Sequence, residues 1–171
     1  MKRLFPLSVI TLLALVLSAG TAGAGAPSLQ WQEWDSGLRD AGKSQRPVLV
    51  DVYTDWCGWC RRMERDVYSR PEVKDYLSKK FVIVKLNAES NEAARYEGRS
   101  WTGRSLASRF QVTGYPTTIF LRSNGEHLAN LPGYIAADRF LLLLRYVGDG
   151  AMDRGVSFED FSRTAGSTPA R

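Results

Sequence analysis

Cys57 and Cys60 are the only two cysteines among the 171 residues of this chain, and two residues separate them. They come shortly after the apolar run 48–53, which predicts a buried strand, and they open a predicted helix. Two thiols with this spacing at a helix start can form and break a disulfide with little movement of the backbone. We therefore expect the pair to carry out thiol–disulfide exchange.

The two cysteines are expected to have different roles. A thiolate is the attacking species in disulfide exchange, and a free cysteine is mostly protonated at neutral pH. Cys57 begins the predicted helix, where unpaired backbone N–H groups and the helix dipole favour an anion, and Arg61 and Arg62 add positive charge. Cys57 is therefore the expected nucleophile. Cys60, expected to lie one turn further in and to be better shielded, would attack Cys57 and release the reduced product.

Three residues around the cysteines are candidates for substrate binding. Gly58 would let a substrate backbone approach closely, or it is simply a permissive residue at a helix start. Trp56 and Trp59 flank the pair. In an ordinary helix each would be a core residue, but beside an exchanging cysteine we expect at least one to form an apolar platform around the exposed sulfur.

The N-terminus has the pattern of a secretory signal peptide. Lys2 and Arg3 precede an apolar stretch, residues 7–17, which is too short to span a bilayer comfortably. Ala22-Gly23-Ala24 fits a cleavage site, so we expect residues 1–24 to be removed and the protein to be periplasmic. An uncleaved membrane anchor is the alternative.

Export would change both the charge and the meaning of the cysteines. Cleavage removes Lys2 and Arg3 but no acidic residue, so the formal charge falls from +5 to +3. With no lysine-rich run, we expect a mixed, solvated surface and no nucleic-acid partner. A purely structural disulfide is disfavoured, because closing so short a loop stabilises by only about 2 kcal/mol and the mature chain is long enough to build a core.

The rest of the chain predicts one α/β domain, residues 29–147, with a central mixed sheet flanked by helices on both faces. The patterns predict strands over 48–53, 81–86, 117–121 and 127–131, and helices over 31–42, 57–68, 71–79, 104–110 and 136–147. Residues 91–103 are polar and predict a loop. The segment 148–171 is expected to be a mobile tail, although Phe158 and Phe161 could dock a short helix.

Residues 50–60, Val-Asp-Val-Tyr-Thr-Asp-Trp-Cys-Gly-Trp-Cys, resemble the active-site strand and helix of the thioredoxin-like family. The resemblance implies a thioredoxin-like fold. Asp51 lies six residues before the first cysteine, where this family keeps a buried acid, and Lys85 matches the lysine that faces it. The resemblance implies that Asp51 accepts the proton of Cys60 and that Lys85 modulates its pKa. From the residues alone, a buried acid is costly unless it is paired or working, so a structural ion pair is the alternative.

Gly114-Tyr115-Pro116-Thr117 resembles the family loop that faces the cysteines and holds a cis-proline. The resemblance implies a cis bond before Pro116. It also implies that the backbone of Tyr115 pairs with an extended substrate segment. Tyr115, Pro116 and Thr117 are therefore further candidates for substrate binding.

Within the family, the chain is most similar to the exported branch, which includes the C-terminal domain of the reductant carrier DsbD and the SoxW-type thioredoxins. Two departures are apparent. The cysteines enclose Gly-Trp instead of the Gly-Pro of cytoplasmic thioredoxin. Residues 94–103 look like an insertion, either a tolerated surface loop or a partner-specific lip.

These observations favour an exported, monomeric thiol–disulfide oxidoreductase that acts as a reductase. Its expected partners are protein disulfide or dithiol substrates and a membrane-embedded thiol electron donor, with no cofactor. The same site could run as an oxidase or isomerase. A Cu(I)-binding module using both thiolates is the alternative from another class. A zinc site is disfavoured because His127 is the only histidine, so we expect no resident metal.

Overall fold

The computed structural model describes residues 28–166, so the predicted signal peptide lies outside the described residues. The helices are α1 (Trp34–Ser44), α2 (Gly58–Met63), the π-helical segment η1 (Glu64–Tyr68), α3 (Pro71–Lys80), α4 (Gly103–Arg109), α5 (Ala137–Gly148) and α6 (Phe158–Gly166). The strands are β1 (Val48–Tyr53), β2 (Val82–Asn87), β3 (Ala93–Tyr96), β4 (Arg99–Thr102), β5 (Thr117–Leu121) and β6 (His127–Pro132).

The predicted mixed central sheet is confirmed. Its strand order is β2-β1-β5-β6, with β1 parallel to β2 and antiparallel to β5, and β5 antiparallel to β6. The first five residues of β1 are all buried, as expected for a central strand covered on both faces. This places the residues that follow β1, including both cysteines, at one end of a rigid strand.

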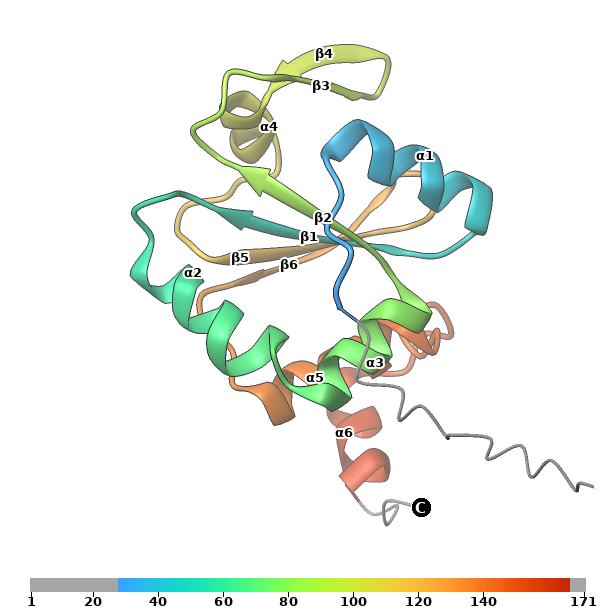
Figure 1. Ribbon diagram of the computed structural model, residues 1–171. Helices are drawn as coiled ribbons and strands as arrows, with labels where there is room; N and C mark the ends of the chain where they lie inside the picture. The colour runs from blue at the N-terminus through green and yellow to red at the C-terminus, as the bar shows by residue number, and fades with distance from the viewer. Residues whose placement is uncertain (1–27, 167–171) are drawn as a thin grey trace, which may run out of the picture.

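Helices cover both faces of the sheet, as predicted (Figure 1). Side chains alternate along a strand, so Val50 of β1 joins one core cluster and Leu49 joins the other. The first cluster packs under α1 and α4, and the second packs under α2, η1, α3 and α5. Asp51 points toward the second cluster, which is the side of α2.

The first helix begins later than the sequence pattern predicts. It starts at Trp34 instead of residue 31, because Gln32 forms a parallel bridge with Val84 at the outer edge of β2. This pairing satisfies backbone groups that an edge strand otherwise leaves open. The apolar spacing of residues 31–42 does not report such a contact.

The expectation of a loop over residues 91–103 is wrong. Residues 94–103, the insertion, lie almost wholly in a hairpin of β3 and β4. Its two-residue turn, Glu97-Gly98, has positive φ at both positions, the geometry that suits a tight hairpin. The hairpin is held against α1, because the indole Nε1 of Trp34 donates a hydrogen bond to the carbonyl of Arg95 at 3.0 Å.

The C-terminal segment contains the short helix that the two phenylalanines suggested. In α6, the rings of Phe158 and Phe161 lie 5.4 and 5.5 Å from the ring of Tyr146 on α5. The hydroxyl of Tyr146 also donates to the carbonyl of Val156 at 2.7 Å. Residues 158–166 thus differ from a featureless tail, while 167–171 lie outside the described residues.

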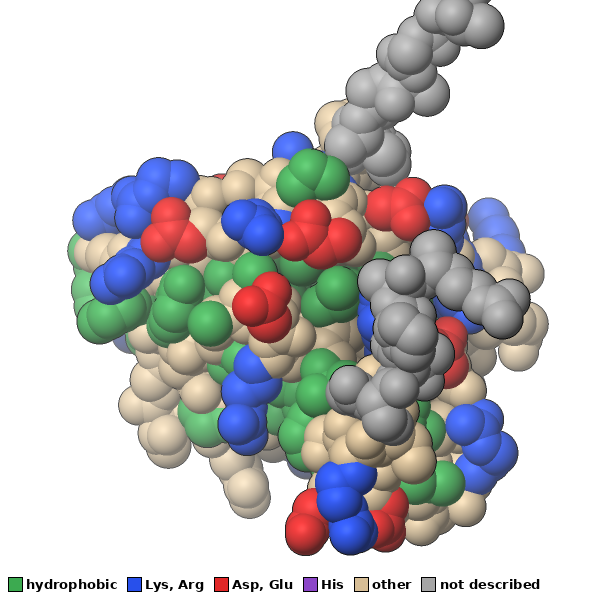
Figure 2. All heavy atoms as spheres, turned by 90° about the horizontal axis from the view of Figure 1, so that it is seen from below, with side chains coloured by type: hydrophobic (Ala, Val, Ile, Leu, Met, Phe, Trp, Pro, Cys, Tyr) green, Lys and Arg blue, Asp and Glu red, His purple; other side chains and the backbone are tan. Residues whose placement is uncertain are grey.

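The surface is mixed on the face formed by α2, α3, α5 and α6. Figure 2 shows basic and acidic side chains interspersed there, with hydrophobic side chains between them. Among residues 28–166, no helix combines the length and apolar character needed to cross a bilayer.

Candidate active site

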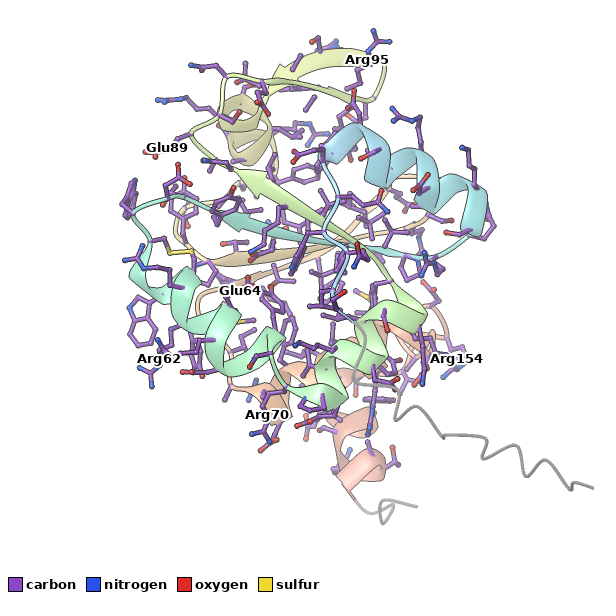
Figure 3. The ribbon with its side chains drawn as sticks, in the orientation of Figure 1. Arg62, Glu64, Arg70, Glu89, Arg95 and Arg154 are labelled. Carbon is purple, nitrogen blue, oxygen red and sulfur yellow. A yellow bond between two sulfur atoms is a disulfide. The ribbon has the colours of Figure 1, made fainter. Side chains whose placement is uncertain are left out.

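The two cysteines form a disulfide at the start of α2 (Figure 3). Cys57 is the N-cap residue of α2, and its Sγ accepts a hydrogen bond from the backbone N–H of Cys60 at 3.0 Å. The turn before the helix is closed by the N–H of Cys57 donating to the carbonyl of Thr54. The first cysteine therefore lies where helix N–H groups can stabilise a thiolate, as its predicted role requires.

The expected difference in shielding is reversed in this disulfide form. Cys57 is only 4% exposed, whereas Cys60 is half-buried. The residue following Cys57 in the helix, Gly58, is exposed. The roles of the two cysteines stay predictions that rest on the position of Cys57 at the N-cap.

Asp51 and Lys85 form a buried ion pair behind the cysteines. They are register partners in the parallel pair β1–β2, and Lys85 Nζ lies 2.7 Å from Asp51 Oδ2. Asp51 is 2% exposed. The structure thus brings together the two residues that the family resemblance matched.

The surroundings of Asp51 favour its protonated form more than exposure to water would. Burial raises the pKa of Asp51 above its ordinary value, and the lowering effect of Lys85 only partly offsets it. Burial lowers the pKa of Lys85, but Asp51 and Glu64 outweigh it and hold that pKa above its ordinary value. Asp51 can therefore exchange a proton while Lys85 keeps its charge.

Four residues that the sequence analysis did not select complete this site. Glu64 Oε2 lies 2.8 Å from Lys85 Nζ, and the hydroxyl of Tyr68 donates to Asp51 Oδ1 at 3.3 Å. The side chains of Trp31 and Tyr53 place their rings 4.6 and 5.2 Å from the same ammonium. Lys85 is therefore held by two carboxylates and enclosed by aromatic rings.

Only Glu64 had a local signal in the sequence. It lies four residues after Cys60, so both side chains share one face of the helix. Figure 3 shows Glu64 on the side of the helix that faces the sheet. Its segment is π-helical, a local distortion that is frequent at functional sites.

The loop facing the cysteines has the form that the family resemblance implied. The Tyr115–Pro116 bond is cis. The hydroxyl of Thr117 donates to the carbonyl of Gly114 at 2.8 Å, and the N–H of Gly133 donates to the carbonyl of Pro116 at 2.7 Å. Pro116 and Thr117 are buried, and Tyr115 is half-buried. Tyr115 is thus the member of this group best placed to meet a substrate.

The two active-site tryptophans are exposed, and the core alternative for them is wrong. Trp56 and Trp59 are 65% and 53% exposed, and they are the exposed large hydrophobic residues of the described chain. The ring of Trp56 lies 5.9 Å from that of Tyr115, and its Nε1 donates to Glu89 at 3.1 Å. The ring of Trp59 lies 5.6 Å from that of Tyr134. The disulfide is therefore flanked by two aromatic pairs.

Two further expectations concern the space at Gly58 and a metal site. A side chain at Gly58 would have only Arg61 Nη2 within 4 Å, at 3.9 Å, so open space lies above it, as both interpretations of this glycine require. His127 lies on β6, where its Nε2 is 2.8 Å from Asn130 Oδ1. Among residues 28–166, no group of three or more His, Cys, Asp or Glu side chains could hold a metal ion.

Comparison with known proteins identifies the family. The thioredoxin-like domain matches residues 34–148, so the chain belongs to the thioredoxin-like family. With its Cys57–Cys60 pair, it is similar to thiol–disulfide oxidoreductases. The predicted membership of the family and the predicted class of enzyme are thereby confirmed.

Its relatives are redox proteins by name. The disulfide bond reductase DsbH of Chlamydia pneumoniae is 26% identical over 133 residues, which cover 73% of this chain and 80% of the relative. The thiol:disulfide interchange protein DsbD of Ralstonia nicotianae is 32% identical over 66% of this chain. The match spans only 17% of that DsbD, and 16% of the DsbD of Pectobacterium atrosepticum.

Solved structures agree on the fold. A thioredoxin from Thermus thermophilus has a TM-score of 0.59 at 29% identity, covering 74% of this chain and 94% of that one. A thioredoxin-fold protein from Helicobacter pylori has a TM-score of 0.63 at 22% identity, covering 71% of this chain and 80% of that one. The second likeness shows the fold alone.

Proposed function

We propose that this chain is an exported thiol–disulfide reductase that uses Cys57 and Cys60 to reduce disulfides in other proteins. The observation that carries the proposal is the disulfide at the start of α2, flanked by two exposed tryptophans and backed by a buried ion pair. The name of the relative DsbH, a disulfide bond reductase, supports the proposed direction of electron flow.

In the proposed reaction, the Cys57 thiolate attacks one sulfur of a substrate disulfide. A Cys57–substrate disulfide forms, and the other substrate sulfur leaves as a thiolate. Cys60 then loses its proton and attacks Cys57, which releases the second substrate sulfur as a thiolate and leaves Cys57 and Cys60 oxidised. Two electrons pass to the substrate, so a thiol donor must reduce the pair again before the next cycle.

Asp51 is the proposed acceptor of the Cys60 proton. Its raised pKa suits this task, because a base works best when its pKa is near the pH at which it operates. Lys85 keeps its charge beside it and limits how far burial raises that pKa.

Substrates are proposed to bind across the exposed rings. Trp56, Trp59 and Tyr115 surround the disulfide with apolar surface, and the backbone of Tyr115 is the proposed pairing site for an extended substrate segment. The name of the DsbD relatives, thiol:disulfide interchange protein, supports exchange with a thiol partner. A membrane-embedded thiol donor is part of the proposal, and export to the periplasm is proposed from the pattern of residues 1–24.

The Cys60→Ser variant tests the proposed order of attack. Without the resolving thiol, Cys57 should hold substrates as mixed disulfides that are stable on non-reducing gels and disappear with dithiothreitol. The matched variant Cys57→Ser should trap far less, and the double variant should trap nothing. Trapping by Cys57→Ser alone would reverse the roles of the two cysteines, and trapping by neither would contradict exchange with proteins.

A further inference from the structure

The N-terminal arm, residues 28–33, extends the sheet next to the ion pair. The N–H of Gln32 donates to the carbonyl of Ile83 at 2.9 Å, and the N–H of Lys85 donates to the carbonyl of Gln32 at 3.0 Å. The arm therefore lies along the outer edge of β2 and is held by the backbone of Lys85 itself (Figure 1). A short arm is thus fixed at the strand that carries the lysine of the site.

This pairing places the indole of Trp31 on the groups that hold Asp51. The ring centroid of Trp31 is 4.6 Å from Lys85 Nζ and 5.1 Å from the ring centroid of Tyr68, which it meets edge to face. Lys85 and Tyr68 each donate a hydrogen bond to the Asp51 carboxylate, one at each oxygen. Trp31 therefore touches both partners of Asp51, although it lies 20 residues earlier in the chain.

The Lys85 side of the ion pair is its more exposed side. The side chain of Asp51 is 3% exposed and that of Lys85 is 27% exposed, so the lysine is the side from which water can reach the pair. A cation within about 6 Å of an indole face is attracted to the ring, and the attraction grows when water is excluded. Trp31 is half-buried and packs against the second core cluster, so its ring is supported from behind.

We propose that Trp31 is a positioning residue of the disulfide-exchange site, held by the N-terminal arm over the Lys85 ammonium so that it keeps water from the Lys85–Asp51 pair. The consequence of this position for catalysis rests on the proposed function. The effect of the indole on the ion pair is independent of that function.

The sign of the effect follows from what acts on Asp51. Burial is the largest influence and raises its pKa, while Lys85 lowers it, Glu64 raises it and the Tyr68 hydroxyl lowers it. Tyr53 on β1 also faces the pair, with its ring 5.2 Å from the ammonium. Without the indole, water reaches the pair, the burial effect weakens, and the pKa of Asp51 should fall toward its ordinary value.

The experiment is a carboxyl ¹³C NMR titration of Asp51 in the oxidised protein, with Asp51→Asn to assign the resonance. In Trp31→Ala the midpoint should fall by at least about half a pH unit, a shift well within the roughly one-unit spread of carboxyl values in proteins. Trp31→Phe, which keeps a ring over the ammonium, should recover most of the difference. Trp101→Ala is the matched control, because Trp101 is also half-buried but packs in the first core cluster.

A second variant separates the arm from the indole. Gln32→Pro removes the N–H that is donated to Ile83 but keeps Trp31, so detaching the arm should lower the Asp51 midpoint as Trp31→Ala does. An unchanged or raised midpoint in the folded variants would overturn the proposal. So would a fall of equal size in Trp101→Ala, which would indicate a general loss of stability.

The link to catalysis has its own measurement. The rate at which Cys60 resolves a Cys57 mixed disulfide should change with pH, and its midpoint in Trp31→Ala should move with the Asp51 titration. If the carboxyl midpoint moves and the rate profile does not, Trp31 still positions the ion pair, and the proposed role of Asp51 as proton acceptor fails.

Discussion

Burial of Asp51 raises the pKa that its proposed role as a proton acceptor uses, but it lowers the stability of the folded protein. It is buried with one lysine beside it, and its pKa is raised in the folded protein. The folded state therefore binds a proton at Asp51 more tightly than the unfolded chain does. Stability is lost as the pH rises from the ordinary carboxyl pKa of 3.8 to the raised value, and the loss is complete above it.

Asp51→Asn should accordingly make the protein more stable at pH 7. The amide is neutral, still accepts from the hydroxyl of Tyr68, and leaves Lys85 paired with Glu64. The gain should be about 1.4 kcal/mol for each unit by which folding raises the pKa, and it should vanish near pH 3, where the wild-type carboxyl is protonated in both states. Urea unfolding at the two pH values measures it.

The control for this change is Asp40→Asn, at an exposed acid on α1, which packs on the first core cluster at the other face of the sheet. It should leave the free energy of unfolding nearly unchanged at both pH values. A loss of stability in Asp51→Asn at pH 7 would mean that the attraction to Lys85 exceeds the cost of burying the charge.

At the scale of elements, the C-terminal helix α6 and the active-site helix α2 lie on different parts of the fold (Figure 1). The contacts of α6 run through Phe158 and Phe161 to Tyr146 on α5. None of these three residues touches the ion pair or the cysteines in the contacts described above. The helix is therefore expected to support stability without taking part in exchange.

Ending the chain after residue 156 tests this separation. The shortened protein keeps the hydrogen bond from Tyr146 to Val156 but loses two aromatic contacts, each worth about 0.5–1.5 kcal/mol beyond buried area. From the two ring contacts alone we expect a loss of roughly 1–3 kcal/mol in the free energy of unfolding, to which the lost burial of apolar area adds, and an unchanged reduction potential. Phe158→Ala with Phe161→Ala in the full chain should reproduce both results; a changed potential would connect α6 to the site.

At the scale of the whole molecule, the direction of electron flow depends on the stability of the dithiol relative to the disulfide. Groups that stabilise the Cys57 thiolate make the protein more oxidising, because they favour the reduced form. The hydrogen bond from the N–H of Cys60 acts in that direction. The buried carboxylate of Asp51 opposes it, because a second negative charge nearby disfavours a thiolate.

The reduction potential should therefore lie in the range of reductases. Equilibration with dithiothreitol or glutathione buffers should give a value near that of thioredoxin, roughly −270 mV. A value near about −120 mV, typical of a strong oxidant, would reassign the protein to disulfide formation. The double variant Cys57→Ser with Cys60→Ser should show no transition and serves as the blank.

Much of the fold and half of the site were predictable from local patterns. The buried run of β1, the spacing of Cys57 and Cys60, and the turn before β6 each lie within a few residues, so periodicity and spacing report them directly. Asp51 and Lys85 were identified through the family resemblance, because their positions relative to the cysteine motif and to β2 match the family. The hairpin of residues 94–103 was missed because its residues are polar and only two of them face the core in β3.

The sequence by itself determined the redox chemistry, the family and the alternation of strands and helices, since these depend on residue type and short-range spacing. Only the tertiary structure decided which side chains enclose the ion pair. Trp31 meets Lys85 from the N-terminal arm, and Glu64 and Tyr68 meet it from η1; the pairing of Gln32 with the edge of β2 brings Trp31 into place. Packing sets such distances between remote segments, and no local pattern of residues encodes them.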